Sequence, residues 1–270
     1  MRLYFNEWEE YPATWLGNLF PDADVDDRDI RDVGAADVLV YDRVHLFAGI
    51  GGWELGLQLA GWPCDLPVWT GSCPCQPFSV AGKQKGAADV RHLWPEMYRL
   101  VRECTPPVIF GEQVAGAGGL EWFDGVRADL ETVNYAVGMA VLPAACVGTP
   151  HKRERIFWVA HSNSVQRHDS VRSQVAEITR GCDHTQQQKW GRAPEPQRAC
   201  TAVSWSHYQR VHCSDGRNRR VEPGISPVAH GVPARVGRTR AYGNAVVPQV
   251  AALFVRAYML SVRIPVGGVT

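Results

Sequence analysis

Up to residue 160 the chain alternates between two patterns of apolar positions. Short apolar runs, most of them with β-branched or aromatic residues, predict strands; these runs lie at 2–6, 38–47, 66–70, 108–110, 135–141 and 155–160. Apolar residues at helical spacing predict helices; these segments lie at 11–19, 52–60, 93–104 and 120–132. Strands that alternate with helices are typical of an α/β fold with a doubly wound, mostly parallel sheet.

Residues 162–220 follow neither pattern. They are polar and rich in Gln, Ser, His and Arg, which favours a small loop-rich region outside the sheet. A chain of 270 residues allows one large α/β domain and a small addition. We therefore expect a main domain at 1–161, a small region at 162–220, and a return segment at 221–270 that completes the main domain.

The net charge is zero, which by itself argues against a nucleic-acid partner, but the charges are unevenly distributed. Residues 1–42 contain eleven Asp or Glu against three Arg, whereas residues 151–240 contain sixteen Lys or Arg against seven acids. Trp190, Trp205 and Tyr208 lie among these basic residues. Because such a segment suits contact with a phosphate backbone, the distribution favours DNA contact over a merely solvated basic surface.

Composition argues against several other classes of protein. An apolar content of 45% with 21% charged residues is ordinary for a soluble globular chain. No stretch approaches the roughly 20 apolar residues of a membrane helix, and Glu7 comes too early for a signal peptide. Eight irregularly spaced cysteines predict free thiols in a cytoplasmic protein, not a disulfide scaffold.

The segment Pro74-Cys75-Gln76-Pro77-Phe78-Ser79 carries the clearest chemistry. Its prolines fix the backbone on both sides of the thiol and end the strand predicted at 66–70. The sulfur therefore lies on a stiff loop at a strand end, where open α/β sheets hold their ligands. A cysteine kept for packing alone needs no such constraint.

This segment resembles the nucleophile loop of the cytosine-5 DNA methyltransferases. Four further segments resemble motifs of that family, and together they cover most of the chain except about 162–220. They are the glycine loop Phe47-Ala48-Gly49-Ile50-Gly51-Gly52, Gly111-Glu112-Gln113-Val114 for Glu-Asn-Val, His151-Lys152-Arg153-Glu154-Arg155 for Gln-x-Arg-x-Arg, and the closing Gly-Asn motif at 242–248. The resemblance implies the Rossmann-like fold of S-adenosylmethionine-dependent methyltransferases.

The resemblance also implies transfer of a methyl group to C5 of cytosine in duplex DNA. Cys75 would add to C6 of the base, because covalent catalysis divides a difficult step into easier ones. Glu112 would protonate N3 from a carboxyl whose pKa is raised by burial. Arg153 and Arg155, at strand spacing, would point to one face, hold the base and favour the thiolate. The base would be flipped out of the duplex, and residues 162–220 would read its neighbours.

The other expected contacts are to S-adenosylmethionine, and no metal is implied. Glycines allow a ligand to approach the backbone closely, and an acid at the second strand end would bind ribose hydroxyls. Glu7 fills the second role, and Asp29, with Asp24 as a weaker candidate, would reach the adenine amine. The expected cofactor residues are Phe47, Gly49, Ile50, Gly52, Glu7, Trp8, Asp29, Ile30, Pro74, Leu93, Asn244, Ala245 and Val246.

The order of the motifs differs from that of the family. Only 28 residues separate Phe47 from Cys75, too few for two further strand–helix units. Segments 6–11 and 28–33, upstream of the glycine loop, resemble the two motifs expected there. We infer a permuted order, which requires Glu7 to lie close to the glycine loop. The alternative is that residues 1–42 are an unrelated acidic extension.

Three other functions remain open. A cofactor- and DNA-binding regulator without turnover would fit His151 and Gln113, which depart from the family's motifs. An RNA cytosine-5 methyltransferase would share the core, although the Cys-Phe-Thr signature of the tRNA-methylating branch is absent. A zinc or thiol-dependent protein would use residues at spacings that match no usual zinc pattern; these are Cys182, His184, Cys200, His212 and Cys213.

The expected setting follows from the same resemblance. We expect a monomer without membrane attachment in the cytoplasm of a bacterial or phage-infected cell. Duplex DNA is the expected partner, and a cognate restriction endonuclease that shares the recognition site is a candidate second partner.

Overall fold

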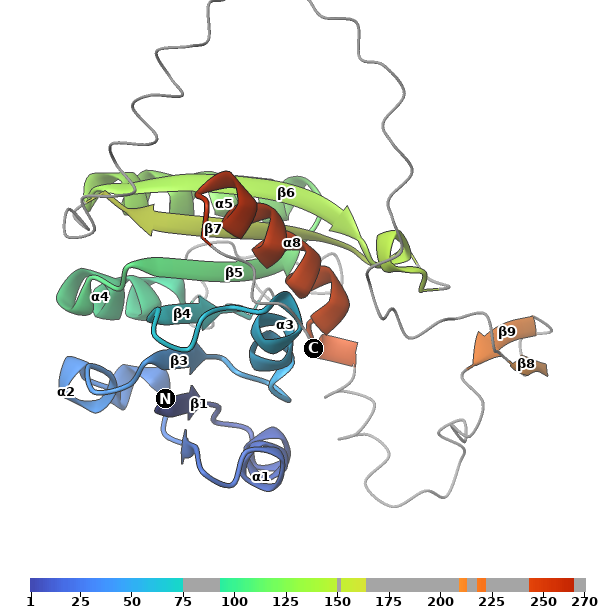
Figure 1. Ribbon diagram of the computed structural model, residues 1–270, viewed down its shortest axis with the longest axis horizontal. Helices are drawn as coiled ribbons and strands as arrows, with labels where there is room; N and C mark the ends of the chain where they lie inside the picture. Colours follow the sequence, from blue (N-terminus) through green and yellow to red (C-terminus); the bar gives the residue numbers. More distant parts are fainter. Residues whose placement is uncertain (75–92, 150–151, 164–208, 213–217, 222–242, 265–270) are drawn as a thin grey trace, which may run out of the picture.

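The computed structural model describes residues 1–74, 93–149, 152–163, 209–212, 218–221 and 243–264. Its centre is a seven-stranded sheet with the order β2-β1-β3-β4-β5-β7-β6 (Figure 1). The strands are β1 (Leu3–Asn6), β2 (Asp24–Asp26), β3 (Arg43–Leu46), β4 (Val68–Gly71), β5 (Val108–Val114), β6 (Tyr135–Pro143) and β7 (Glu154–Ser162). The strands β2, β1, β3, β4 and β5 are parallel to one another. Strand β7 runs antiparallel to both of its neighbours, β5 and β6. The predicted α/β class with a mostly parallel sheet is confirmed.

Helices cover both faces of this sheet (Figure 1). They are α1 (Glu10–Leu19), α2 (Ala35–Val38), α3 (Gly52–Ala60), α4 (Trp94–Cys104), α5 (Ala117–Thr132) and α8 (Pro248–Ser261), with the 3₁₀ turns η1 (Ile30–Asp32) and η3 (Ala144–Val147). One core cluster joins α4 and α5 to one face, and a second joins α3 and α8 to the other. Neighbouring residues of β4 divide between them, Trp69 in the first and Val68 in the second, because strand side chains alternate between faces.

Two short strands lie apart from the main sheet. Strands β8 (Gln209–His212) and β9 (Asn218–Val221) form a separate antiparallel pair. They fall in or next to the region expected at 162–220, most of which lies outside the described residues. The proposed domain boundaries at 161 and 220 therefore stay predictions.

The helix ends follow from local chemistry. Helix α3 begins after Gly51 and ends at Gly61, both with positive φ (81° and 76°), a conformation that costs glycine little. Helix α4 has Pro95 in its first turn, where the missing N–H would have no helical partner. These ends place the glycine loop directly between β3 and α3.

The structure corrects several expected elements. The run predicted as a strand at 38–47 divides into the end of α2 and the shorter strand β3. Strand β5 extends to Val114, so Glu112 lies inside a strand and not at its end. The short edge strand β2 was not predicted, because Asp-Val-Asp has too few apolar residues to give a strand pattern.

The parallel strands end together at one edge of the sheet. In register, Asn6 of β1 pairs with Leu46 of β3, Leu46 with Gly71 of β4, and Gly71 with Gly111 of β5. The residues that follow these positions therefore gather at the carboxyl edge, where open α/β sheets bind their ligands. Strand β1 lies directly beside β3, although β2 and α2 separate them in the sequence.

Candidate active site

The glycine loop between β3 and α3 is the most constrained segment of the carboxyl edge. Phe47, Gly49 and Gly51 have positive φ values of 53°, 57° and 81°. Phe47 is unusual, since side chains other than glycine rarely adopt this conformation outside sites where the surroundings enforce it. A Cβ at Gly51 would lie 2.7 Å from the ring of Phe20, so α1 packs directly on the loop.

Glu7, at the end of β1, reaches this loop. The backbone N–H of Gly49 donates a hydrogen bond of 2.8 Å to Glu7 Oε2, and the N–H of Glu9 donates one of 3.0 Å to Oε1. The side chain is buried, with 8% exposed. A Cβ at Gly49 would meet no atom within 4 Å, so open space lies beside the loop where Glu7 holds it. A ligand that approaches this backbone therefore meets a fixed carboxylate.

A cavity of about 610 Å³ lies between α1, the glycine loop, α3 and the segment 243–248, here called the closing segment. Four of the expected cofactor residues line it: Ile50, Gly52, Ala245 and Val246. Sequence reasoning missed the contribution of α1, which supplies Trp15 and Leu19 to the wall. The helical spacing of α1 marked an apolar face, but it did not indicate what that face would contact.

The other expected cofactor residues do not line this cavity. Phe47 and Leu93 pack against the first core cluster, which contains Ile30. Trp8 is 63% exposed, Asn244 is exposed and Pro74 is half-buried. Asp29 accepts hydrogen bonds from the backbone and guanidinium of Arg31 at the start of η1. Asp24 lies at the opposite end of β2 and accepts from Tyr41, which does not favour it as a substitute.

Glu112 of β5 is the second buried carboxylate of this edge. Arg155 of β7 pairs with it, with 2.8 Å between Arg155 Nε and Glu112 Oε1. Burial raises the pKa of Glu112 above its ordinary value, although the charges of Arg155 and Arg153 oppose the shift. A carboxyl in this state can hold a proton at a pH where an exposed glutamate is ionised.

Arg153 differs from the expectation. It precedes β7, has a φ of 35°, and is not at strand spacing from Arg155. Its guanidinium donates to the carbonyl oxygens of Gly243 (2.9 Å) and Ala245 (2.8 Å). Arg153 thus fastens the closing segment, while its charge still acts on Glu112. His151 lies outside the described residues.

The expected nucleophile, Cys75, lies outside the described residues. The described segment before it ends at Pro74. Just before it, Cys73 is buried, and burial raises the pKa of its thiol, so Cys73 is a poor nucleophile. Gln113 of β5 donates from Nε2 to the Cys73 carbonyl at 3.4 Å, and its Oε1 accepts from the Val114 N–H. The residue that replaces the family's Asn thus links β5 to the start of the Cys75 loop.

Sequence reasoning also missed a buried polar cluster beneath the glycine loop. Arg43 and His45 of β3 and Glu54 of α3 are 2%, 1% and 0% exposed. The signal was present in the sequence: Arg43 and His45 alternate with Val44 and Leu46 in a strand whose two faces are both covered. Charged residues at such positions are buried only when they are paired.

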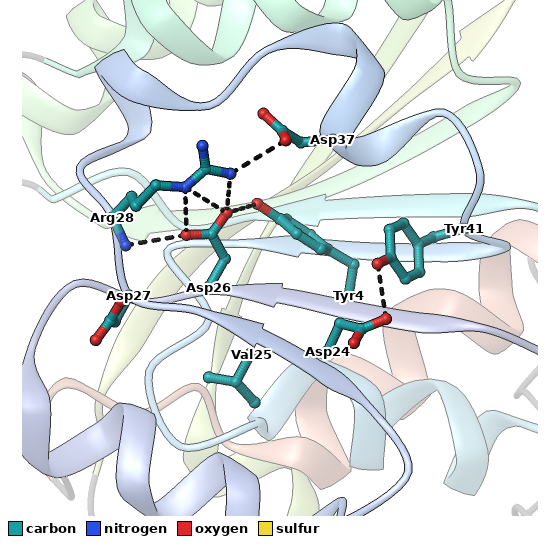
Figure 2. A pocket seen from close by; sticks show the side chains of 8 residues that line it. All are labelled: Tyr4, Asp24, Val25, Asp26, Asp27, Arg28, Asp37 and Tyr41. Atoms are coloured by element: carbon teal, nitrogen blue, oxygen red, sulfur yellow. Dashed lines mark hydrogen bonds and ion pairs between the residues drawn. The ribbon is translucent and has the colours of Figure 1, made fainter.

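A second, acidic cavity of about 400 Å³ lies at the β2 edge (Figure 2). Its side chains satisfy one another: Tyr4 donates to Asp26 at 2.6 Å, and Arg28 pairs with both Asp26 and Asp37. Burial, and then the hydrogen bond to the Asp26 carboxylate, raise the pKa of Tyr4. These contacts fasten β2 and α2 to β1 and mark the cavity as structural.

Two kinds of feature are absent from the described part of the chain. No helix there is long and apolar enough to cross a membrane. No group of His, Cys, Asp and Glu there is arranged to hold a metal ion. Cys182, His184, Cys200 and Cys213 lie outside the described residues, and His212 is hydrogen-bonded to Asn218.

A comparison with protein families finds one match that covers more than half of the chain. The model of the C-5 cytosine-specific DNA methylases matches residues 63–215. The match begins after the glycine loop and includes the Cys75, Glu112 and Arg155 segments. It does not include residues 1–62.

Curated bacterial proteins are similar over part of their length. The Type II methyltransferase M.AplI of Arthrospira platensis is 32% identical over 157 residues, which cover 45% of this chain and 46% of that protein. The Type II methyltransferase M.HhaI of Haemophilus parahaemolyticus is 29% identical over 161 residues, which cover 45% and 49%. The matched part of the chain thus spans about half the length of these relatives.

Among solved structures, a Spodoptera frugiperda DNMT2 mutant superimposes with a TM-score of 0.41 and 17% identity, over 60% of this chain and 43% of that chain. A likeness of this size supports no further conclusion. The assignment rests on the family match, which spans more than half of the sequence and includes the Glu112–Arg155 pair. The chain belongs to the family of C-5 cytosine-specific DNA methylases.

Proposed function

We propose that this protein transfers a methyl group from S-adenosylmethionine to C5 of cytosine in duplex DNA. The observation that carries the proposal is the ion pair between the buried Glu112 of β5 and the half-buried Arg155 of β7. It lies one residue beyond the register position where β4 ends and leads towards Cys75. A proton donor on β5 and a thiol that follows the neighbouring strand β4 in the sequence are the two groups that activation of cytosine requires.

Cys75 supplies the nucleophile. Its thiolate adds to C6 of the base and forms a carbon–sulfur bond, while electrons move towards N3. C5 then becomes nucleophilic enough to accept a methyl group. A water molecule takes the C5 proton, the carbon–sulfur bond breaks to release the thiolate, and the N3 proton returns to the Glu112 carboxylate, which restores the neutral aromatic ring. Cys73 is excluded from this role by its burial.

Glu112 acts as the general acid at N3. Its raised pKa keeps a proton available, and Arg155 at 2.8 Å orients the carboxyl. The positive charges of Arg155 and Arg153 favour a thiolate nearby over a neutral thiol. Since N3 lies inside a base pair in duplex DNA, the base must be flipped out before this proton transfer can occur.

The residues at the carboxyl edge fit S-adenosylmethionine, which would supply an electrophilic methyl group. Gly49 leaves free space beside a buried carboxylate, and the neighbouring cavity is of the size that small-molecule sites have. Glu7 would accept hydrogen bonds from the ribose hydroxyls, and Asp29 one from the adenine amine. Trp8, Ile30, Phe47, Pro74 and Leu93 would enclose the adenine, and the 244–246 segment the methionine part.

We also propose that the motif order is permuted. Strand β1, which Glu7 follows, lies beside β3, where the next strand along the chain lies in the common doubly wound order. The Glu7–Gly49 hydrogen bond supports the proposal that β1 is the second cofactor segment. If residues 1–42 were an unrelated extension, a carboxylate contact to the glycine loop would not be expected.

The biological setting is part of the same proposal. The similar bacterial proteins are named as Type II methyltransferases. We place this chain in the cytoplasm of a bacterial or phage-infected cell, as a monomer that modifies DNA, with a cognate restriction endonuclease as a candidate partner. Residues 162–220 would read the bases around the target.

The deciding experiment uses S-adenosylmethionine with a labelled methyl group and equal amounts of mixed-sequence duplex DNA and RNA. Base analysis should find the label on C5 of cytosine in DNA. Cys75→Ser should abolish the label, and Cys73→Ala should retain it as the matched control. Label in RNA alone would favour an RNA methyltransferase, and cofactor binding without any label would favour a regulator; either result overturns the proposal.

A further inference from the structure

The buried polar cluster beneath the glycine loop joins β3, α3 and β4. Glu54 accepts hydrogen bonds from Arg43 Nη1 at 2.7 Å and Gln58 Nε2 at 2.8 Å, and its second oxygen lies 3.0 Å from His45 Nε2. His45 Nδ1 lies 2.8 Å from the hydroxyl of Thr70 on β4. One carboxylate therefore collects three donors in a place without exposed surface.

The proton arrangement follows from these contacts. Since a carboxylate can only accept, His45 Nε2 carries the proton, and in a neutral ring Nδ1 then accepts from the Thr70 hydroxyl. Burial alone would raise the pKa of Glu54, but the hydrogen bond from His45, the charge of Arg43 and the hydrogen bond from Gln58 outweigh it and lower the pKa. The Glu54 carboxylate and the Arg43 guanidinium thus form a neutral, fully buried pair.

The position of the cluster points to a purpose beyond packing. His45 lies two residues before Phe47, and Glu54 two residues after Gly52, so their contact joins the two ends of the loop. The backbone between them is held with positive φ at Phe47, Gly49 and Gly51. A strained loop keeps its shape only when its ends are fixed. Buried ion pairs are weak contributors to stability when compared with apolar residues, so stability alone does not explain this one.

We propose that Arg43, His45 and Glu54 are positioning residues for cofactor binding, which set the glycine loop in its binding conformation from below. Glu7 holds the same loop from the side of β1 through the Gly49 N–H. Thr70 extends the cluster to β4, the strand that leads to Cys75. The glycine loop and β4 are thereby joined to a single buried group. This inference rests on the proposed function for the identity of the cofactor.

The test compares three variants of the full chain. His45→Leu removes the bond across the loop and leaves the Arg43–Glu54 pair intact. His45→Gln restores an amide donor at the same place. Tyr135→Phe is the matched control, because it removes one buried hydrogen bond, to the Pro106 carbonyl at 2.7 Å, before the amino end of β5 and far from the loop.

The first measurement is the affinity for S-adenosylmethionine by calorimetry, together with the free energy of unfolding. His45→Leu should weaken binding roughly tenfold, the equivalent of one hydrogen bond to a charged group. His45→Gln should recover part of that loss, and Tyr135→Phe should bind as the wild type does. At saturating cofactor, kcat of His45→Leu should stay close to the wild-type value.

The second measurement does not depend on the cofactor. Amide hydrogen exchange of the free protein at residues 47–52 should become faster in His45→Leu and stay unchanged in Tyr135→Phe. The inference would be overturned if His45→Leu had the same exchange rates and the same affinity as the wild type. It would also be overturned if Tyr135→Phe lost affinity in proportion to its loss of stability. If exchange is faster in His45→Leu but the wild type does not bind S-adenosylmethionine, the cofactor assignment is overturned. The conclusion that the cluster positions the loop would then still hold.

Discussion

Glu54 and Glu112 are both buried glutamates that pair with an arginine, yet their pKa values move in opposite directions. The pKa of Glu54, on α3 beneath the glycine loop, is lowered. The pKa of Glu112, on β5 next to β4, is raised. Both residues are buried in the same domain, so the opposite directions of their pKa shifts must come from their immediate partners.

The number of donors accounts for the difference. Glu54 receives hydrogen bonds from Arg43, His45 and Gln58, and these outweigh the cost of burying its charge. Glu112 has Arg155 as its nearest cation, and burial dominates. A carboxylate surrounded by donors serves as a fixed charge, whereas one with few donors can carry a proton. The comparison assigns a positioning role to the first and an acid role to the second.

The largest expected effect is on catalysis. Glu112→Gln keeps the shape of the side chain and removes its acid, so methyl transfer should fall about 10²–10⁴-fold. Affinity for S-adenosylmethionine should not change, because Glu112 belongs to the base side of the site. Single-turnover kinetics and calorimetry would measure the two quantities. A variant that retains more than half of the wild-type rate would show that Glu112 is no acid.

The same substitution at the other carboxylate should act on stability. Glu54→Gln leaves the buried Arg43 charge without its counterion, and unfolding in urea should require about 3–5 kcal/mol less than in the wild type. The chemical step should be nearly unchanged in molecules that remain folded. A loss of unfolding free energy below about 1 kcal/mol would contradict the view that the pair is fully buried and mutually dependent.

The two groups should also respond to pH with opposite sign. Because the folded-state pKa of Glu54 is lowered, its contribution to stability is present above its ordinary pKa and is lost as the pH falls through the folded value. Because the pKa of Glu112 is raised, its protonated form disappears as the pH rises through that value, and kcat should then fall by up to about tenfold per pH unit. Urea titrations below pH 5 would follow the first, and a pH–rate profile the second. The acid role would be refuted if the wild-type rate kept rising with pH and the pH–rate profile of Glu112→Gln were the same.

A smaller effect is expected at Glu7, the second support of the glycine loop. Glu7→Ala removes the acceptor for the Gly49 N–H and the proposed ribose contact, so affinity for S-adenosylmethionine should fall roughly tenfold. DNA affinity in a gel-shift assay should remain close to that of the wild type. Unchanged cofactor affinity would remove the main support for the permuted motif order.

Much of the fold could be predicted because four helices and most strands carry regular apolar periods, although α2 and α8 were not among the predicted helices. Strand β5 was predicted too short, since Gly111 and Gln113 resemble a loop. Gly111 is required there because the Trp158 ring occupies the place of a side chain, only 2.1 Å from where a Cβ would stand. That packing between β5 and β7 is invisible in a single sequence.

The site was predictable where a motif fixes a role and less so where geometry decides. The resemblance assigned Glu112 and Arg155 to catalysis and Glu7 to the cofactor; these roles stay predictions, and the structure shows the Glu112–Arg155 ion pair and the Glu7–Gly49 hydrogen bond. It did not reveal that Arg153 leaves the strand, because a φ of 35° has no sequence signal in a non-glycine residue. The Arg43–His45–Glu54 cluster was missed because polar residues in a strand are ordinarily assigned to solvent.

The central claim is a covalent bond between Cys75 and C6 of a flipped cytosine, and the most direct test is to trap it. The wild-type protein should be incubated with S-adenosylmethionine and duplex DNA that contains 5-fluorocytosine, whose fluorine blocks release of the enzyme. We expect a protein–DNA complex that survives a denaturing gel, forms with Cys73→Ala, and is absent with Cys75→Ser. Clean separation of wild-type protein from DNA that is methylated in its unfluorinated form would contradict the covalent mechanism.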